Sequence, residues 1–376
     1  MTMANNKEKK VLNVPNLRFP EFTDKWEAGK LEEYILLVSG QDLSSEQYTD
    51  KEDVYPYITG ASSLNSEGII LNRWTHTPTQ IVKRGDILLV CKGSGVGQLT
   101  VLSNVDKAHI ARQIMGIRAK NTESQLFIYH YLSRLMTELK KRSTGIIPGI
   151  DRKSILSLHI SIPSLQEQQK VAELLSLIEQ RIITQNKIIE KLQSLIKGLR
   201  VCCMQRVYGN NVYLSEIAQI YQPQTISSTE LTEDGFLVYG ANGIIGKYKD
   251  YNHETEQICI TCRGNTCGMV NYTKPMSWIT GNAMVINTDK YQDKVCKRYL
   301  YHYLSAYNFN SIISGSGQPQ IVRTPLEKFK ITLPTISEQK QKAIIFDKIQ
   351  DKIDINHKVL NLYIGQKRYL LRQMFI

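Results

Sequence analysis

Two stretches of sequence, Ile162-Pro-Ser-Leu-Gln-Glu-Gln-Gln169 and Leu333-Pro-Thr-Ile-Ser-Glu-Gln-Lys340, decide the fold of this chain. They lie 171 residues apart, and a long segment with apolar residues every three or four positions follows each of them. A motif that repeats together with the element after it indicates a duplicated structural unit. The 376-residue chain is therefore expected to hold two domains, each followed by its own long helix.

The similarity of the two halves extends upstream of these motifs. Gly85–Gly97 aligns with Glu256–Gly268 at the same offset, and both segments read as a buried strand that runs into a glycine-rich loop. Tyr-His-Tyr-Leu-Ser occurs at 129–133 and again at 301–305, on a predicted helix. Before each proline, apolar residues alternate, from Ile155 to Ile162 and from Leu326 to Leu333, which predicts a strand in both halves. Each domain is therefore expected to be α+β with many short strands.

The long segments after the two motifs have the heptad spacing of a coiled-coil seam. A helix from about residue 167 to residue 204 would span about 57 Å, more than a small domain needs to cover itself. The seam is polar at Gln185 and at its counterpart Asn356, which could set the register of a helix pair. The alternative is two amphipathic helices, each packed on its own domain. The residues predicted to pair are Ile178, Ile182, Gln185, Ile189, Leu192, Ile349, Ile353, Asn356, Leu360 and Tyr363.

The predicted fold class is α+β, with two globular domains joined by two long antiparallel coiled-coil helices in a pseudo-two-fold arrangement. Such symmetry would match the antiparallel strands of DNA. The predicted boundaries are a flexible leader at 1–15, domain 1 at 16–162, helix 1 at 163–206, domain 2 at 207–333 and helix 2 at 334–376.

The charge of the chain favours a polyanionic partner. Lys and Arg number 47 against 35 Asp and Glu, so the formal net charge is +12. The N-terminus lacks the apolar core of a signal peptide, and no segment approaches the roughly 18 apolar residues of a membrane-spanning helix. We therefore expect a cytoplasmic protein without membrane contact, whose seven cysteines are reduced.

The motifs that resemble sites of chemistry are incomplete. Gly93–Gly97 lacks the Gly-Lys-Ser/Thr of a nucleotide-binding loop, so a turn that presents Lys92 toward a backbone phosphate is the better interpretation. Cys259, Cys262 and Cys267 align with Leu88, Cys91 and Val96, which favours core thiols over metal ligands. Methyltransferase signatures such as Asn-Pro-Pro-Tyr are absent from the sequence. We expect a binding protein without catalytic residues, metal or cofactor of its own.

Cationic, amide and aromatic residues gather in the predicted loops of both halves. Arg, Lys, Asn and Gln are the side chains that contact guanine and adenine edges, while phosphate contacts need only charge. Solvated surface charge is the alternative for any single residue. The candidate DNA-binding residues are Asn72, Arg73, Trp74, Lys92, Ser94, Arg112, Gln113, Lys141, Arg142, Arg152, Asn242, Lys247, Tyr248, Arg263, Asn265, Asn282 and Arg323.

Nearly the whole chain resembles the specificity subunits of type I restriction-modification systems. The resemblance rests on the opening Leu17-Arg-Phe-Pro-Glu-Phe-Thr-Asp24 with Trp26, on the two Pro-x-x-x-Glu-Gln helix starts and on the closing Leu370-Leu-Arg-Gln-Met-Phe375. The first helix departs from the closing pattern at Val201-Cys-Cys-Met204.

The resemblance implies a division of labour among subunits. Each domain would be a target-recognition domain for one half of a bipartite, asymmetric DNA sequence, and the paired helices would set the spacer between the half-sites. Two modification subunits with S-adenosylmethionine would methylate adenine, and restriction subunits would use ATP and Mg to translocate and cleave double-stranded DNA. The outer helix faces, with Lys187, Lys191, Lys352 and Lys358, would meet these subunits.

Two functions of other classes remain as alternatives. A coiled-coil scaffold could use the same basic loops to meet acidic proteins without sequence-specific DNA binding. A nuclease subunit is disfavoured, because no carboxylate cluster repeats in the two halves. A comparison of binding to matched and random DNA separates the first alternative from the DNA-binding hypothesis.

Overall fold

The computed structural model describes residues 13–65, 67–120, 122–142, 149–205, 207–241, 243–315 and 317–376. Residues 1–12 of the expected leader lie outside these ranges. The chain divides into two compact units, Met1–Asn186 with Val359–Ile376 (unit 1) and Lys187–Lys358 (unit 2). Unit 1 is therefore discontinuous in sequence, whereas unit 2 is one continuous segment.

Unit 1 is built on two four-stranded sheets. The first is antiparallel throughout, with β11 and β8 in its centre, and all four residues of β8 are buried. Its strand order is β2 (Ile35–Ser39), β11 (Ile114–Ala119), β8 (Ile87–Val90) and β9 (Leu99–Val101). The second sheet pairs β3 with β10 in parallel, and its order is β6 (Trp74–Thr75), β3 (Tyr55–Ile58), β10 (Lys107–Ile110) and β7 (Ile81–Lys83).

Shorter elements complete unit 1. β1 pairs with β12 just before Pro163, the proline of the first repeated motif, and β4 and β5, of two residues each, pair antiparallel. These elements are β1 (Glu27–Lys30), α1 (Leu31–Tyr34), β4 (Leu64–Asn65), β5 (Gly68–Ile69), α2 (Gln125–Arg142), α3 (Arg152–Leu156) and β12 (His159–Ile162).

Unit 2 repeats this plan. β20 and β17 occupy the centre of an antiparallel sheet, and β15 pairs with β19 in parallel as β3 does with β10. The first sheet is β14 (Gln219–Tyr221), β20 (Ala283–Asn287), β17 (Ile258–Thr261) and β18 (Val270–Tyr272); the second is β16 (Gly243–Tyr248), β15 (Phe236–Gly240) and β19 (Ser277–Ile279). The remaining elements are β13 (Asn210–Tyr213), α5 (Lys297–Ala306), α6 (Arg323–Glu327) and β21 (Lys330–Leu333).

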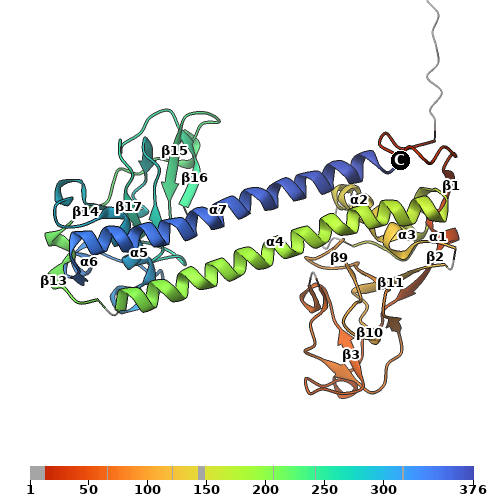
Figure 1. Cartoon of the computed structure of the whole chain (residues 1–376). Helices are drawn as coiled ribbons and strands as arrows, with labels where there is room; N and C mark the ends of the chain where they lie inside the picture. Colours follow the sequence, from red (N-terminus) through yellow and green to blue (C-terminus); the bar gives the residue numbers. More distant parts are fainter. Residues whose placement is uncertain are drawn as a thin grey trace, which may run out of the picture. The chain divides into compact units, whose positions relative to one another are not determined.

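The two long helices are α4 (Leu165–Gln205) and α7 (Ile336–Gln373), shown in Figure 1. They pair antiparallel within each unit. In unit 1, Lys367 Nζ of α7 lies 2.5 Å from Glu179 Oε1 of α4, and in unit 2, Lys342 Nζ donates to the Cys203 carbonyl oxygen at 3.4 Å. The predicted α+β fold class with paired antiparallel helices is therefore confirmed.

The predicted pairing residues lie on the inner faces of these helices. Ile178, Gln185, Ile189 and Ile353 are buried. The other six are half-buried: Ile182, Leu192, Ile349, Asn356, Leu360 and Tyr363. The seam packs into the domains as well, because the unit 1 core contains Val171 and Leu175 of α4 and the unit 2 core contains Phe346 of α7.

The alternating strand that the sequence predicted before each proline is partly wrong. The structure has short helices, α3 and α6, over the first part of each stretch, and only β12 and β21 are extended. In unit 1 the carboxylate of Asp151 caps α3 by accepting from the Ser154 backbone nitrogen at 2.7 Å. An Asp at this position favours a helix start over a continuing strand.

The Gln of each Pro-x-x-x-Glu-Gln motif has a role that the sequence did not show. Gln168 is buried, accepts from the Ser124 backbone nitrogen at 2.9 Å and donates to the Pro163 carbonyl at 3.0 Å. Gln339 does the same in unit 2, with the Cys296 nitrogen and the Pro334 carbonyl, both at 2.9 Å. These amides fix the start of α4 to the start of α2 in unit 1, and the start of α7 to the start of α5 in unit 2.

Candidate nucleic-acid interface

Three loops meet beyond the end of β8 in unit 1. The Cys91 backbone nitrogen donates to the Gln113 carbonyl at 2.8 Å, and the Cys91 carbonyl accepts from the Ile150 nitrogen at 2.8 Å. A Cβ added at Gly95 would lie 2.3 Å from the Cβ of Ala61, so the glycine-rich loop packs directly on the turn after β3. The exposed side chains of Lys92, Ser94, Arg112 and Gln113 are therefore presented together.

Unit 2 holds its loops by the same backbone hydrogen bonds. The Cys262 nitrogen donates to the Asn282 carbonyl at 3.1 Å, and the Cys262 carbonyl accepts from the Ile321 nitrogen at 3.0 Å. Gly264 and Gly268 have φ values of 88° and 92°, as Gly93 and Gly97 have 87° and 79° in unit 1, so all four need glycine. Arg263, Asn265 and Asn282 are exposed in this cluster.

Arg112 is held in place by a neighbouring carboxylate. Its Nε lies 2.7 Å from Asp42 Oδ2, and its backbone nitrogen donates to Asp42 Oδ1 at 3.1 Å. Sequence reasoning selected Arg112 but missed Asp42, which lies 70 residues away in the chain. The equivalent of Arg112 in unit 2 is Gly281, which precedes Asn282 as Arg112 precedes Gln113.

Several other candidate DNA-binding residues lie outside these loop clusters, or their side chains contact neighbouring residues. Arg73 Nε pairs with Asp50 at 3.2 Å, with its guanidinium over the Tyr48 ring, and the half-buried Trp74 lies on β6 beside Pro56 of β3. Asn72 is exposed just before this strand. Arg152 Nη1 donates to the Leu37 carbonyl at 2.8 Å, and Arg323 Nε pairs with Glu327 at 2.7 Å.

A basic and aromatic patch lies on the second sheet of unit 2. Lys247 and Tyr248 are on β16, and Lys247 Nζ is 3.4 Å from Asp234 Oδ1. Tyr248 stacks edge-on against Trp278 of β19 with centroids 5.0 Å apart. Trp278 was not selected from the sequence, because nothing in its local context links it to Tyr248. The predicted residue Asn242 and the side chains of Lys141 and Arg142 lie outside the described part of the chain.

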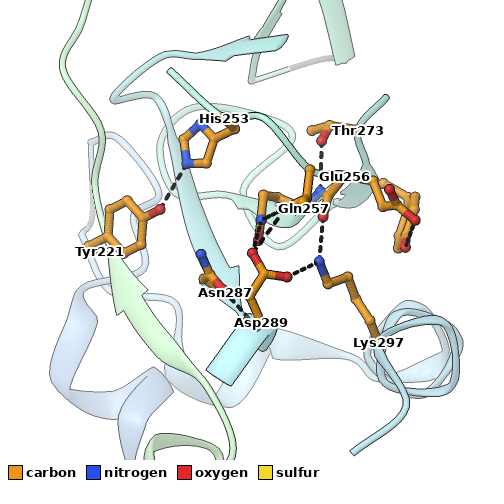
Figure 2. A network of polar contacts seen from close by, with 10 residues as sticks. Tyr221, His253, Glu256, Gln257, Thr273, Asn287, Asp289 and Lys297 are labelled. Carbon is orange, nitrogen blue, oxygen red and sulfur yellow. Dashed lines mark hydrogen bonds and ion pairs between the residues drawn. The ribbon is translucent and has the colours of Figure 1, made fainter. Parts of the chain in front are cut away.

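A partly buried polar network supports the first sheet of unit 2 (Figure 2). Lys297 Nζ of α5 lies 2.5 Å from Asp289 Oδ1, and Asp289 Oδ2 accepts from Gln257 Nε2 at 2.8 Å. The hydroxyl of Tyr221 on β14 lies 2.8 Å from His253 Nε2. Burial would raise the pKa of Asp289, but the hydrogen bonds from Lys297 and Gln257 outweigh it and lower that pKa. The network ties the segment before β17 to β14 and to α5.

The repeated histidines are packing residues. His130 and His302 are fully buried, and their Nε2 atoms lie 3.1 Å from Ser176 Oγ and 2.9 Å from Asp347 Oδ1. Arg200 Nη2 donates to His302 Nδ1 at 2.9 Å, so this nitrogen is unprotonated and the ring is neutral. Burial lowers the pKa of both histidines.

The cysteines singled out in the sequence lie in or beside the unit 2 core. Cys259 and Cys262 are buried and Cys267 is half-buried, and burial raises the pKa of Cys259 to about 12. Among the residues that the structure describes, no three His, Cys, Asp or Glu side chains gather as metal ligands would. No helix of the described ranges is both long and apolar enough to cross a bilayer.

Comparison with known proteins identifies this arrangement. The family model for the type I restriction modification DNA specificity domain matches residues 23–194 and again residues 210–362. The chain therefore belongs to this family, with one copy of the domain in each half, and it is a specificity subunit of the type I restriction-modification class. Subunits of this class are non-catalytic, and they bind DNA and assemble with modification and restriction subunits.

Individual relatives agree with this assignment. The MjaVIII specificity subunit of Methanocaldococcus jannaschii is 25% identical over 408 residues, which cover 94% of this chain and 92% of that protein. The EcoprrI specificity subunit of Escherichia coli is 31% identical over 147 residues, or 38% of this chain and 36% of that protein. The crystal structure of an S subunit from M. genitalium has the same fold, with a TM-score of 0.67, 18% identity and coverage of 96% and 99%.

Proposed function

We propose that the chain recognises a bipartite, asymmetric sequence in double-stranded DNA, one half-site through the loop cluster of each unit. The observation that carries this proposal is the contrast between the two clusters. Equivalent backbone hydrogen bonds hold the loops in both units, yet the exposed side chains differ: Lys92, Arg112 and Gln113 in one and Arg263 and Asn282 in the other, where Gly281 replaces the arginine. A common scaffold with different side chains suits the reading of two different half-sites.

The same proposal assigns the chemistry to partner subunits. Two modification subunits with S-adenosylmethionine would methylate adenine in the bound site, and restriction subunits with ATP and Mg would cleave unmodified DNA, in the cytoplasm. Apolar side chains outside the seam support a docking surface on the long helices. Within unit 2, Leu195 of α4 is 49% exposed and Ile344 and Ile355 of α7 are 53% and 57% exposed. These exposed apolar side chains are the surface that a docked subunit would cover.

Methylation-motif sequencing tests the proposal. Cells that express the chain with a modification subunit should carry methylated adenines in one motif with two different half-sites and a fixed spacer. A palindromic motif, or none, would contradict the proposal. The predicted boundaries of the recognition domains can be tested in the same cells, because exchange of residues 16–162 should replace only one half-site.

The rival function, a protein scaffold without sequence-specific DNA binding, is tested by equilibrium binding. Duplexes with the identified motif should bind more tightly than random duplexes, and the affinity should fall steeply as salt rises, because phosphate contacts release counterions. Equal affinity for both duplexes would favour the scaffold. A flat salt response would show that phosphate contacts are not the main source of affinity.

A further inference from the structure

The pair formed by Arg112 and Asp42 has the geometry of an arginine prepared to bind a base. Asp42 uses both carboxylate oxygens on the same residue, one on the Arg112 backbone nitrogen at 3.1 Å and one on the side-chain Nε at 2.7 Å. Asp42 thus engages the backbone nitrogen and the Nε of Arg112, and it leaves the terminal nitrogens Nη1 and Nη2 uncontacted by its carboxylate. No hydrogen bond joins these terminal nitrogens to another residue in the part of the chain that the structure describes.

The segment that carries Asp42 is itself fixed. The Gln41 nitrogen donates to the Ile110 carbonyl at 2.9 Å, and the Leu43 nitrogen donates to the Tyr57 hydroxyl at 3.2 Å. A Cβ at Gly40 would lie 2.0 Å from the Ala111 carbonyl oxygen, so only glycine allows the two segments to approach this closely. The carboxylate is therefore held against Arg112 by its own backbone, which lowers the entropy that Arg112 loses on binding.

Stability gives a poor account of this pair. The side chains of Arg112 and Asp42 are 69% and 45% exposed, and pairs of that exposure add little to folding. In the other exposed Arg–Asp pairs of unit 1, the guanidinium group makes a second contact. The guanidinium of Arg73 lies over the Tyr48 ring, and Arg84, which pairs with Asp106 at 2.9 Å, also donates from Nη1 to the Ser103 carbonyl. Of these three arginines, Arg112 is the one that lies in the loop cluster, beside Gln113, whose carbonyl oxygen accepts from the Cys91 nitrogen.

The geometry points to Arg112 as the residue that reads a guanine in the half-site of unit 1, with Asp42 as its positioning residue; this inference rests on the proposed DNA-binding function. Two parallel N–H groups of a guanidinium match O6 and N7 of guanine in the major groove, and guanine is the base that arginine contacts most often in this way. Gln113, exposed beside Arg112, is an amide of the kind that pairs with adenine.

Unit 2 has no arginine at the position equivalent to Arg112, so the inference is specific to one half-site. Gly281 stands at the position equivalent to Arg112, and a Cβ there would lie 2.5 Å from Thr225 Oγ1 and 2.9 Å from the Pro223 carbonyl oxygen. That position is closed to any side chain. The half-site of unit 2 must therefore be read by other residues, and it serves as an internal control.

Sequencing of methylated motifs with the full chain and a modification subunit tests this inference. Arg112→Ala should make one guanine position of one half-site degenerate, with a roughly 10- to 100-fold loss of discrimination there. Asp42→Asn should weaken the preference at the same position. The other positions of that half-site and the whole second half-site should stay as they are.

The matched controls are Arg84→Ala and Asp106→Asn, which break an exposed pair of the same chemistry elsewhere in unit 1. Both should leave the motif unchanged. A wild-type motif that survives Arg112→Ala without loss at any guanine would overturn the inference and leave the proposed function standing. Loss of both half-sites together would also overturn it, since it would show a general effect on folding or assembly. Absence of any wild-type motif would overturn the proposed function itself.

Discussion

The guanidinium of Arg18 binds the carboxylate of Glu167 with two hydrogen bonds, from Nε and from Nη2, each 2.7 Å long. Glu167 is 1% exposed, and the indole nitrogen of Trp26 lies 3.3 Å from Glu167 Oε1. By position alone, Glu167 and its repeat Glu338 are first-turn carboxylates that would only favour the helix dipole. In unit 1 the glutamate instead attaches the segment before β1 to the start of α4.

Glu167→Gln should therefore destabilise unit 1 by about 2–4 kcal/mol, because it leaves the largely buried Arg18 without its counter-charge. Glu338→Gln is the matched control, since the carboxylate of Glu338 is 44% exposed and forms an i,i+4 pair with Lys342 at 2.9 Å. Its loss should cost about 0.3–0.5 kcal/mol. Urea unfolding of both variants measures the difference, and equal costs would show that the Arg18 contact adds nothing.

Gln168→Ala and Gln339→Ala should each destabilise their own unit by about 1–3 kcal/mol, because each leaves a backbone nitrogen, of Ser124 or Cys296, without its hydrogen-bond acceptor. Gln169→Ala, at the exposed position next to Gln168, is the control and should be neutral. Hydrogen exchange should show faster exchange at the start of α2 in the first variant and of α5 in the second. Faster exchange in both units from one substitution would contradict the separate roles.

Acidification should destabilise the chain through its buried histidines. Burial lowers the pKa of His130 to about 4 from its ordinary 6.5, so the unfolded state takes up a proton in this interval and the folded state does not. The free energy of unfolding therefore falls as the pH falls from 6.5 toward 4, by up to about 3 kcal/mol from this residue. His130→Gln should flatten part of that dependence in urea titrations between pH 7 and pH 4.5. Parallel profiles for the variant and the wild type would refute it.

The free energy of unfolding of unit 2 at acidic pH should depend on Asp289. Its pKa is lowered below the ordinary 3.8, so its contribution is present above that pH and is lost as the pH falls further. Asp289→Asn should cost about 1–3 kcal/mol at neutral pH, because Lys297, only 13% exposed, loses its partner. The variant should also be less sensitive to pH below 3.8 than the wild type. Thermal unfolding across this range checks both statements.

The spacer between half-sites should follow the length of the paired helices. Because Lys342 faces Cys203, the residue that faces Ser194 lies near Asp351, nine residues along each helix. A heptad inserted at both Ser194 and Asp351 keeps the seam in register and should lengthen the spacer of the methylated motif, with unchanged half-sites. A heptad at Ser194 alone is the control and should disturb assembly. A lengthened helix pair with the original spacer would contradict the proposed role.

Local patterns predicted the elements whose neighbours are close in sequence. The heptads identified α4 and α7, since a 3.5-residue period has one structural meaning over so many turns. The alternation before each proline gave a strand prediction that was partly wrong, because Ile155 is buried in the core from a short helix that Asp151 caps. The partners of Glu167 and Arg112 could not be predicted from local sequence patterns, since Arg18 is 149 residues away from Glu167 and Asp42 is 70 residues away from Arg112. For the candidate interface, the sequence pointed to loops and residue types. It could not show that Arg152 Nη1 donates to the Leu37 carbonyl, whereas Arg112 contacts Asp42 through Nε.

The discontinuity of unit 1 has a consequence for the order of synthesis on the ribosome. Leu370, Met374 and Phe375 lie in the same core as Trp26 and Phe127, and the Leu17 nitrogen donates to the Gln373 carbonyl at 2.8 Å. Unit 2 is complete once residue 358 has been made, whereas the core of unit 1 stays open until the final turns of α7 emerge. Unit 2 should therefore fold first during translation. Unit 1 should keep apolar surface exposed until residues 359–376 have been made.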